Sequence, residues 1–237
     1  MKAIRWQSVL FIFFFAFNSG CAGKTAEIKA DSVPIPIFSS PVKIKTHLLI
    51  GKDYQEKNTE WRKEVTAAFQ EVNKQFLKEK IPVFLEIVEI DTKTITPFLL
   101  ERLSVKGGSP LGNLTAYFYW MYSGERVMPP KDIAIIIIRQ KHHLIWGSAY
   151  LAEPVPHVAA VSRLENCKNE NNDCFPYFVG LIMHEVGHLL DARDLKEENE
   201  RKFLMSGGEI DFDEPPRFLI DEKNRLLILE ALKKYYQ

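Results

Sequence analysis

The sequence has no excess of charge of either sign, few cysteines, and no internal repeat or low-complexity tract. Lysine and arginine together number 31, and so do aspartate and glutamate, which gives a formal net charge of zero. Nucleic-acid-binding domains usually carry a basic excess, so the composition gives no support for a nucleic-acid partner. The 237 residues suffice for one domain with a sizeable core, and the apolar content of 46% is ordinary for a globular protein.

The N-terminal apolar run, residues 9–17, is too short to span a bilayer comfortably, which takes roughly 20 residues. It follows a start that carries Lys2 and Arg5, and it precedes "NSGC", which ends at Cys21. This order is typical of a secretory signal. The ending "SGC" resembles the lipobox of bacterial lipoproteins, which implies a lipid anchor on Cys21. The alternative is a plain signal peptide in which Cys21 is incidental.

Only two cysteines remain after Cys21, and they flank the polar stretch "KNENND". If Cys21 carries lipid, Cys167 and Cys174 form an even pair, as expected in an exported protein, and we predict a disulfide between them. Such a short loop would be stabilised by at most about 2.5 kcal/mol on the chain-entropy account. Two free thiols are the alternative.

The chain divides into three parts by composition. We expect a signal peptide over 1–21, a polar tether with interleaved prolines over 22–40, and one domain over 41–237. This arrangement predicts a lipid-anchored protein of a bacterial cell envelope or surface, with secretion as the alternative. We expect the protein to act as a monomer.

Hydrophobic patterning predicts an alternation of strands and helices in the domain. Strands are expected over 42–51, 81–90, 132–139, 146–153 and 157–163, and helices over 58–80, 111–122 and 176–190. The strand at 132–139 has no polar alternation, so it should be buried on both faces. Asn58 can cap the helix that follows it. The order implies a mixed sheet backed by helices.

The last predicted helix contains "HEVGH", with histidines four residues apart. Because positions i and i+4 share one face of a helix, His184 and His188 can both present a ring nitrogen to one Zn²⁺ ion. Glu185 is rotated about 100° from His184, so it would reach a water molecule and act as a general base instead of as a ligand. The alternative, two core histidines and a surface glutamate, must explain their place in an apolar helix.

A catalytic zinc ion usually has three protein ligands, so a third ligand must exist. The nearby candidates are Asp191 and Asp194. Asp191 lies in helical register after His188, whereas Asp194 can reach the metal if the chain turns sharply at 191. Aspartate is among the residues most tolerant of the left-handed backbone that such a turn needs. We therefore predict Asp191 as the pivot and Asp194 as the ligand.

The stretch "HEVGHLLDARD" resembles the extended zinc motif of the metzincin metallopeptidases, with Asp194 at the last position and Asp191 in place of the turn glycine. "FLMSGG" resembles the Met-turn of that family, which makes Met205 the turn methionine. The layout over roughly 42–229 is similar to the adamalysin branch. The resemblance implies an α/β fold with a mostly parallel twisted sheet of about five strands, an antiparallel edge strand and a central zinc-binding helix.

What the resemblance implies about function is hydrolysis of peptide bonds in a polypeptide substrate. Glu185 would take a proton from the water and pass it to the leaving amine. The edge-strand residues Gly147, Ser148, Ala149 and Tyr150 would pair with an extended substrate, although an ordinary edge strand is the alternative.

Two other functions stay open. A zinc-binding but inactive surface lipoprotein could bind a partner protein, although the presence of Glu185 favours an enzyme. A gluzincin-type peptidase would take a distant glutamate as third ligand, such as Glu209 or Glu214. The remaining histidines lie in predicted loops or strands: we interpret His47 as a strand residue, and His142, His143 and His157 as surface residues.

Overall fold

The protein is described by a computed structural model, which covers residues 38–103, 110–125, 131–139, 147–150, 157–163, 173–196, 203–206 and 216–236. All of these belong to one compact unit, Ile35–Gln237. The predicted signal peptide with Cys21, and nearly all of the predicted tether, lie outside the described residues. Among the described helices, none is both long and apolar enough to cross a membrane.

Within the described residues, five strands form one mixed sheet in the order β2-β1-β3-β5-β4. They are β1 (Val42–Ile50), β2 (Val83–Asp91), β3 (Ile133–Arg139), β4 (Gly147–Tyr150) and β5 (His157–Arg163). β1 pairs in parallel with β2 and β3, β3 pairs in parallel with β5, and β4 runs antiparallel to β5. The predicted fold class, a mostly parallel sheet with an antiparallel edge strand, is therefore confirmed.

The sheet is buried most completely along its central strand. The even-numbered residues of β3 belong to one apolar cluster together with α4, and its odd-numbered isoleucines belong to a second cluster together with α2 and α5. Six of the seven residues of β3 are buried, as the unbroken apolar run predicted. β3 therefore fixes helices on both faces of the sheet.

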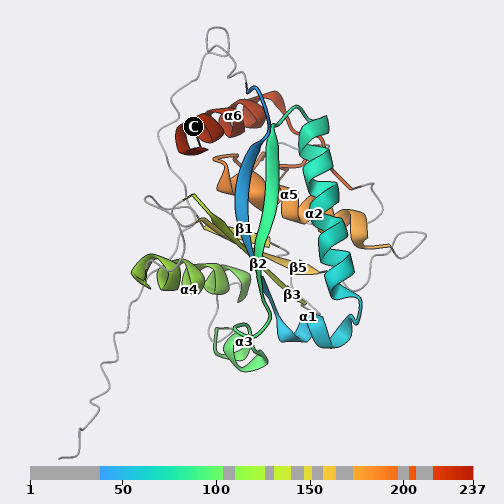
Figure 1. Cartoon of the computed structure of the whole chain (residues 1–237), viewed down its shortest axis with the longest axis vertical. Helices are drawn as coiled ribbons and strands as arrows, with labels where there is room; N and C mark the ends of the chain where they lie inside the picture. Colours follow the sequence, from blue (N-terminus) through green and yellow to red (C-terminus); the bar gives the residue numbers. More distant parts are fainter. Residues whose placement is uncertain are drawn as a thin grey trace, which may run out of the picture. The chain divides into compact units, whose positions relative to one another are not determined.

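In the described part of the chain, six helices flank the strands: α1 (Lys52–Lys57), α2 (Trp61–Lys78), α3 (Pro97–Leu103), α4 (Pro110–Glu125), α5 (Phe175–Leu189) and α6 (Glu222–Tyr236). Figure 1 shows α2 and α5 on one side of the sheet and α4 on the other. α2, α4 and α5 match predicted helices, but α1, α3 and α6 were not predicted. The capping role predicted for Asn58 is wrong: the residue before α2 is Glu60, and Asn58 ends α1 and accepts a hydrogen bond from the Glu60 N–H at 3.0 Å.

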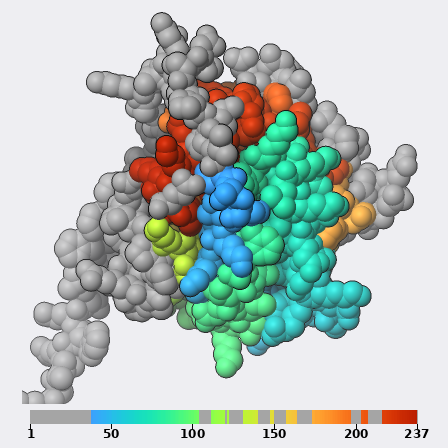
Figure 2. Space-filling model, turned by 45° about the horizontal axis from the view of Figure 1, so that its top comes forward, coloured from blue at the N-terminus to red at the C-terminus, as the bar shows by residue number. Residues whose placement is uncertain are grey.

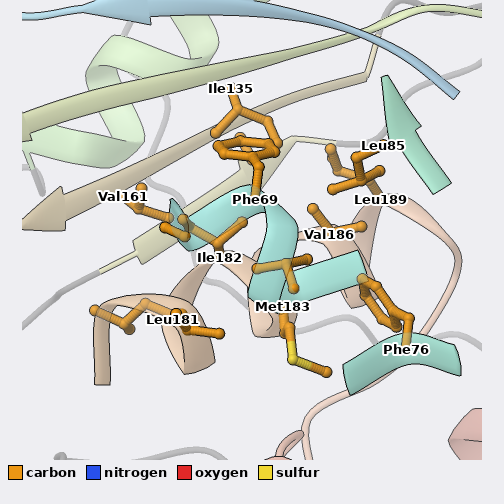
Figure 3. Packing of buried hydrophobic residues seen from close by; sticks show 14 of the residues in the cluster. Phe69, Phe76, Leu85, Ile135, Val161, Leu181, Ile182, Met183, Val186 and Leu189 are labelled. Carbon is orange, nitrogen blue, oxygen red and sulfur yellow. The ribbon is translucent and has the colours of Figure 1, made fainter. Parts of the chain in front are cut away.

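The larger core cluster lies between α2, α5 and the sheet. Its side chains come from the apolar stripe of α2 and from α5, which is apolar nearly all round (Figure 3). Phe69 and Phe76 of α2 face Ile182 and Val186 of α5 in this view. Burial of this kind contributes about 25 cal/mol per Å² of apolar surface. The packing holds α5, the helix with the two histidines, firmly against the sheet.

The edge of the sheet formed by β2 lies at the surface. β2 turns Leu85 towards the core, whereas Phe84 and Val88 on its other face are exposed. Figure 2 shows β1 and β2 at the surface beside α2. The edge formed by β4 is the one close to α5, because β4 contacts both α4 and α5. The β4 edge is therefore the edge of the sheet that contacts the helix with the two histidines.

Candidate metal centre

Two imidazole rings project from the last turns of α5. Pro176 lies in the first turn, where its missing N–H costs nothing, and the helix then runs without a break to Leu189. His184 and His188 are one helical turn apart, and their Nε2 atoms are 3.1 Å from each other. The predicted i, i+4 pairing of the rings is therefore present in the fold.

The other ring nitrogen of each histidine binds a backbone carbonyl. His184 Nδ1 donates to Leu204 O at 2.8 Å, and His188 Nδ1 donates to Ala192 O at 2.9 Å. A carbonyl can only accept, so each Nδ1 carries the hydrogen and each neutral ring has its lone pair on Nε2. Metal-binding histidines are commonly oriented by such a hydrogen bond on the second nitrogen.

The chain reverses sharply after α5, as predicted. Asp191 has a φ of 66°, in the left-handed region that favours glycine. The Asp191 N–H binds His188 O at 3.1 Å, and the Ala192 N–H binds Gly187 O at 3.0 Å, which is the hydrogen-bond pattern of a Schellman motif. Aspartate thus occupies the position where glycine is usual, and the reversal directs the chain back towards the histidines.

The reversal brings Asp194 to the two rings. Its Oδ1 lies 3.4 Å from His184 Nε2 and 3.3 Å from His188 Nε2. Among the described residues, these three form a group of side chains that could hold a metal ion. Three atoms that each lie about 2.0–2.1 Å from one tetrahedral Zn²⁺ ion are about 3.3–3.4 Å apart, so the three donor atoms fit zinc in type and spacing.

The electrostatics of the metal-free group show how closely the three side chains interact. Burial alone would lower the pKa of His184, but the hydrogen bond with Asp194 and the charge of Glu185 raise it to about 9. Burial would raise the pKa of Asp194, but its hydrogen bonds with His184 and His188 hold it well below its usual range. A proton on His184 therefore stabilises the cluster when no metal is bound.

Glu185 is not part of this group of three donor side chains. It is only 5% exposed, and its Oε2 has no hydrogen-bond partner among the described residues. Burial raises the pKa of this carboxyl, while the charges of His184 and His188 partly oppose the rise. The side chain lies against Gly147 of β4, where an added Cβ would be 2.6 Å from Glu185 Cδ. Its position between α5 and β4 keeps it out of the ligand set.

Met205 lies beneath α5. It is fully buried, and a Cβ added to Gly187 would be 2.8 Å from its sulfur. The backbone of this segment is also engaged, because Met205 O accepts from the Leu195 N–H at 2.8 Å. The segment 203–206 therefore contacts the helix, binds His184 through Leu204 O, and binds the backbone of Leu195, the residue after Asp194.

The predicted substrate strand is β4, and its residues alternate between two faces. Gly147 and Ala149 face the α5 side, whereas Ser148 Oγ lies 3.2 Å from Thr115 Oγ1 of α4. The Tyr150 side chain lies outside the described residues. β4 thus brings small residues to the side that carries Glu185.

The other predicted residues fall in several places. His157 is buried, and its Nδ1 donates to Leu189 O at 2.9 Å, so its interpretation as a surface residue is wrong. His157 supplies a donor to a carbonyl that the end of α5 leaves unpaired.

His47 lies in β1 as expected, between Glu89 and Asp132. Cys174 is disulfide-bonded. The described residues do not include Cys167, His142, His143, Glu209 or Glu214.

Two residues near the candidate centre were not predicted to support it. Gly147 was assigned only to substrate pairing, and Asn224 of α6 was not considered. Asn224 binds the backbone of Arg193, directly before Asp194. A leucine-rich stripe with Glu222 at the start and lysines at the end was available to predict α6. Nothing in the sequence connects Asn224 to Asp194, because 29 residues separate them.

The sequence matches no protein-family model and no curated protein. Among solved structures, archaemetzincin from Methanopyrus kandleri is similar, with a TM-score of 0.53 and 14% identity over 81% of this chain and 96% of that chain. A chain of a chaperone–substrate complex gives a TM-score of 0.51 and 15% identity, over 84% of this chain and 36% of that chain. Metalloproteinase-II from Bacteroides fragilis gives a TM-score of 0.46 and 16% identity, over 83% of this chain and 55% of that chain. This chain therefore spans about half of the length of that protein. At these identities the likeness to archaemetzincin shows the fold alone.

Proposed function

We propose that this chain is a zinc-dependent endopeptidase of the metzincin type, with His184, His188 and Asp194 as the ligands. One observation carries the proposal. Two Nε2 lone pairs and a carboxylate oxygen converge within 3.4 Å of one another, although all three are acceptors when the rings are neutral. Such an arrangement is repulsive unless a cation or a proton lies among the three atoms. Two imidazoles and a carboxylate are a usual donor set for zinc.

Glu185 is the proposed general base. A bound zinc ion would act as a Lewis acid, which makes a water molecule more acidic and polarises a peptide carbonyl. Glu185 lies next to His184 in the chain but outside the ligand group, so its carboxylate is available to accept a proton from that water and return it to the leaving amine. Its burial supports this role, because a raised pKa brings a carboxylate closer to the pH at which it must exchange protons.

The proposed substrate is an extended polypeptide that pairs with β4. β4 is the last strand in the sheet order, antiparallel to β5, and its α5 face carries only Gly147 and Ala149. An added strand takes its affinity from backbone hydrogen bonds, and small side chains leave space for the substrate backbone. The contact between Gly147 and Glu185 would bring the scissile bond close to the base.

The remaining parts of the proposal concern the mature protein. We propose that Cys21 carries a lipid anchor, that the protein acts as a monomer at a bacterial envelope or surface, and that Cys167 is the partner of Cys174. Mass spectrometry of the membrane fraction would detect the acylated N-terminal peptide. A Cys21→Ser variant that stays in the membrane fraction with the same mobility would contradict the anchor.

The central experiment is the digestion of a peptide library by the full chain, with and without a zinc chelator. We expect cleavage that is lost with chelator, restored by Zn²⁺, and abolished in Glu185→Gln. Stoichiometric zinc without cleavage of any peptide would favour the alternative function, a zinc-binding protein that recruits a partner. Absence of bound zinc from the purified, zinc-supplied chain would contradict both functions.

A further inference from the structure

The segment that carries Asp194 is held by a buried asparagine of α6. Asn224 is 1% exposed, and its side-chain amide binds both polar backbone groups of Arg193. Its Oδ1 accepts from the Arg193 N–H at 2.7 Å, and its Nδ2 donates to Arg193 O at 2.9 Å. The residue directly before the predicted ligand is therefore fixed in place by one side chain from the C-terminal helix.

The orientation of Asn224 is itself fixed. Asp221 directly precedes α6, and its Oδ1 accepts from the Asn224 backbone N–H at 3.0 Å, as a helix cap does. The other Asp221 oxygen accepts from Asn224 Nδ2 at 2.8 Å. Both amide hydrogens of Asn224 are thus used, and a flipped amide would lose the bonds to Arg193. The first turn of α6 and the Asp194 segment form one hydrogen-bonded unit.

Asp194 needs this support because its own side chain is poorly enclosed. The carboxylate is 50% exposed, so packing alone does not fix it. On its C-terminal side, the Leu195 N–H binds Met205 O at 2.8 Å. Asp194 therefore lies between two residues whose backbones are held, one by Asn224 and one by the segment of Met205. This arrangement reduces the entropy that the carboxylate would lose on binding a metal ion.

We propose that Asn224 is a positioning residue of the metal centre, which makes α6 part of the metal-binding apparatus. By holding Arg193, Asn224 keeps the Asp194 carboxylate within reach of both imidazoles. The inference rests on the proposed function, since it takes Asp194 as a ligand of Zn²⁺. Substitution of Asn224 should lower the affinity for Zn²⁺. The loss of affinity should be larger than in a variant that is equally destabilised at another site.

The chain contains a matched control for this bond pattern. Asn73 of α2 is 8% exposed and binds both backbone groups of Leu85 in β2. Its Oδ1 accepts from the Leu85 N–H at 2.7 Å, and its Nδ2 donates to Leu85 O at 3.2 Å. Asn73→Ala removes the equivalent pair of backbone bonds from a part of the core that contains none of the predicted ligands, whereas Asn224→Ala also removes the bond to Asp221.

The experiment uses the full chain and Zn²⁺ alone as the probe. Dissociation constants are measured by competition with a chromogenic chelator for the wild type, Asn224→Ala, Asn224→Asp and Asn73→Ala. We expect both Asn224 variants to weaken zinc binding about 10- to 100-fold, as loss of a group that orients a ligand typically does. Asn73→Ala should stay within about twofold of the wild type, because distant sites act independently. Wild-type affinity in a folded Asn224 variant would overturn the inference.

Hydrogen–deuterium exchange of the metal-free chain separates this inference from the proposed function. We expect faster exchange of residues 192–196 in the Asn224 variants than in Asn73→Ala, with slow exchange retained in β3 as evidence of folding. If the wild type binds no zinc, the proposed function fails, yet localised fast exchange would still assign the hold on Arg193 to Asn224. Unchanged exchange at 192–196 would overturn that hold. If Asn224→Ala does not fold, the isosteric Asn224→Asp carries both measurements.

Discussion

Gly147 lies directly against the carboxylate side chain of Glu185, at a separation that leaves no room for a side chain on residue 147. An added Cβ would be 2.6 Å from Glu185 Cδ and 2.8 Å from its Cγ. The strand cannot easily retreat, because Gly147 pairs with Val161 and the next residue, Ser148, contacts Thr115 on the other face. The absence of a side chain at 147 therefore determines where the proposed base can lie.

We predict that Gly147→Ala lowers kcat at least tenfold while zinc content and fold are retained, because the methyl group displaces the base. Steady-state kinetics and elemental analysis measure the two quantities. The control is Gly180→Ala in α5, where the added Cβ would meet only Arg217 O at 3.5 Å and Phe218 at 3.9 Å. In a Glu185→Asp background, where the side chain is shorter, Gly147→Ala should lower kcat by a much smaller factor. An equal loss in both backgrounds would contradict a direct contact between residue 147 and the base.

The same reasoning applies to Gly187 and Met205. We predict that Gly187→Ala destabilises the protein by about 1–2 kcal/mol, because overpacking against the buried sulfur outweighs the better helix propensity of alanine. Urea denaturation measures the change. In a Met205→Ala background the clash is gone, so the same substitution should be neutral or stabilising. Gly180→Ala should gain up to about 1 kcal/mol. If Gly187→Ala leaves the free energy of unfolding unchanged with Met205 present, the contact between residue 187 and the Met205 sulfur does not limit the size of the side chain there.

Asp194→Ala should remove most of the bound zinc, because two imidazoles alone make a weak site. The control is Asp191→Gly, which suits the φ of 66° at the turn and should keep full zinc occupancy and equal or higher stability. Elemental analysis after dialysis measures both variants. A full zinc complement in Asp194→Ala would remove Asp194 from the ligand set, and loss of zinc in Asp191→Gly would mean that the Asp191 side chain itself is required.

The sequence alone predicted the parts of this fold that depend on local patterns. The apolar run of β3, the amphipathic helix α2 and the apolar helix α5 were found because burial leaves a trace in the hydrophobic pattern of the chain. The positive φ at Asp191 was also foreseen, since only a tight reversal could return Asp194 to the histidines. α6 was missed although its leucines recur at helical spacing, and its first-turn Glu222 and last-turn lysines fit a helix dipole.

What the sequence could not show are contacts between residues far apart in the chain. His157 was misassigned because a strand-end histidine gives no sign that it will bind Leu189 O at the end of another element. Gly147 carries no side chain to suggest that it faces Glu185. These relationships arise from the register of β4 on β5 and the packing of α5 on the sheet, which local patterning does not specify.

The stability of the metal-free protein should depend on pH through His184. The pKa of His184 is about 9 in the metal-free folded protein, against about 6.5 for an unperturbed histidine. Because the folded pKa is raised, the stability that this proton contributes is fully present below pH 6.5 and is lost as pH rises through about 9. Metal-free protein should therefore lose stability to urea across this interval.

Zinc binding should show the opposite trend with pH, because the ion must displace the proton of His184. Between pH 7 and 8 we expect the dissociation constant for Zn²⁺ to fall by close to tenfold, with about one proton released from His184 per ion bound. Calorimetry in two buffers of different ionisation enthalpy counts the protons. In Asp194→Asn the carboxylate that raises the His184 pKa is gone, so the dependence on pH should become shallower. A pH-independent affinity in the wild type would mean that His184 and Asp194 do not share a proton when the metal is absent.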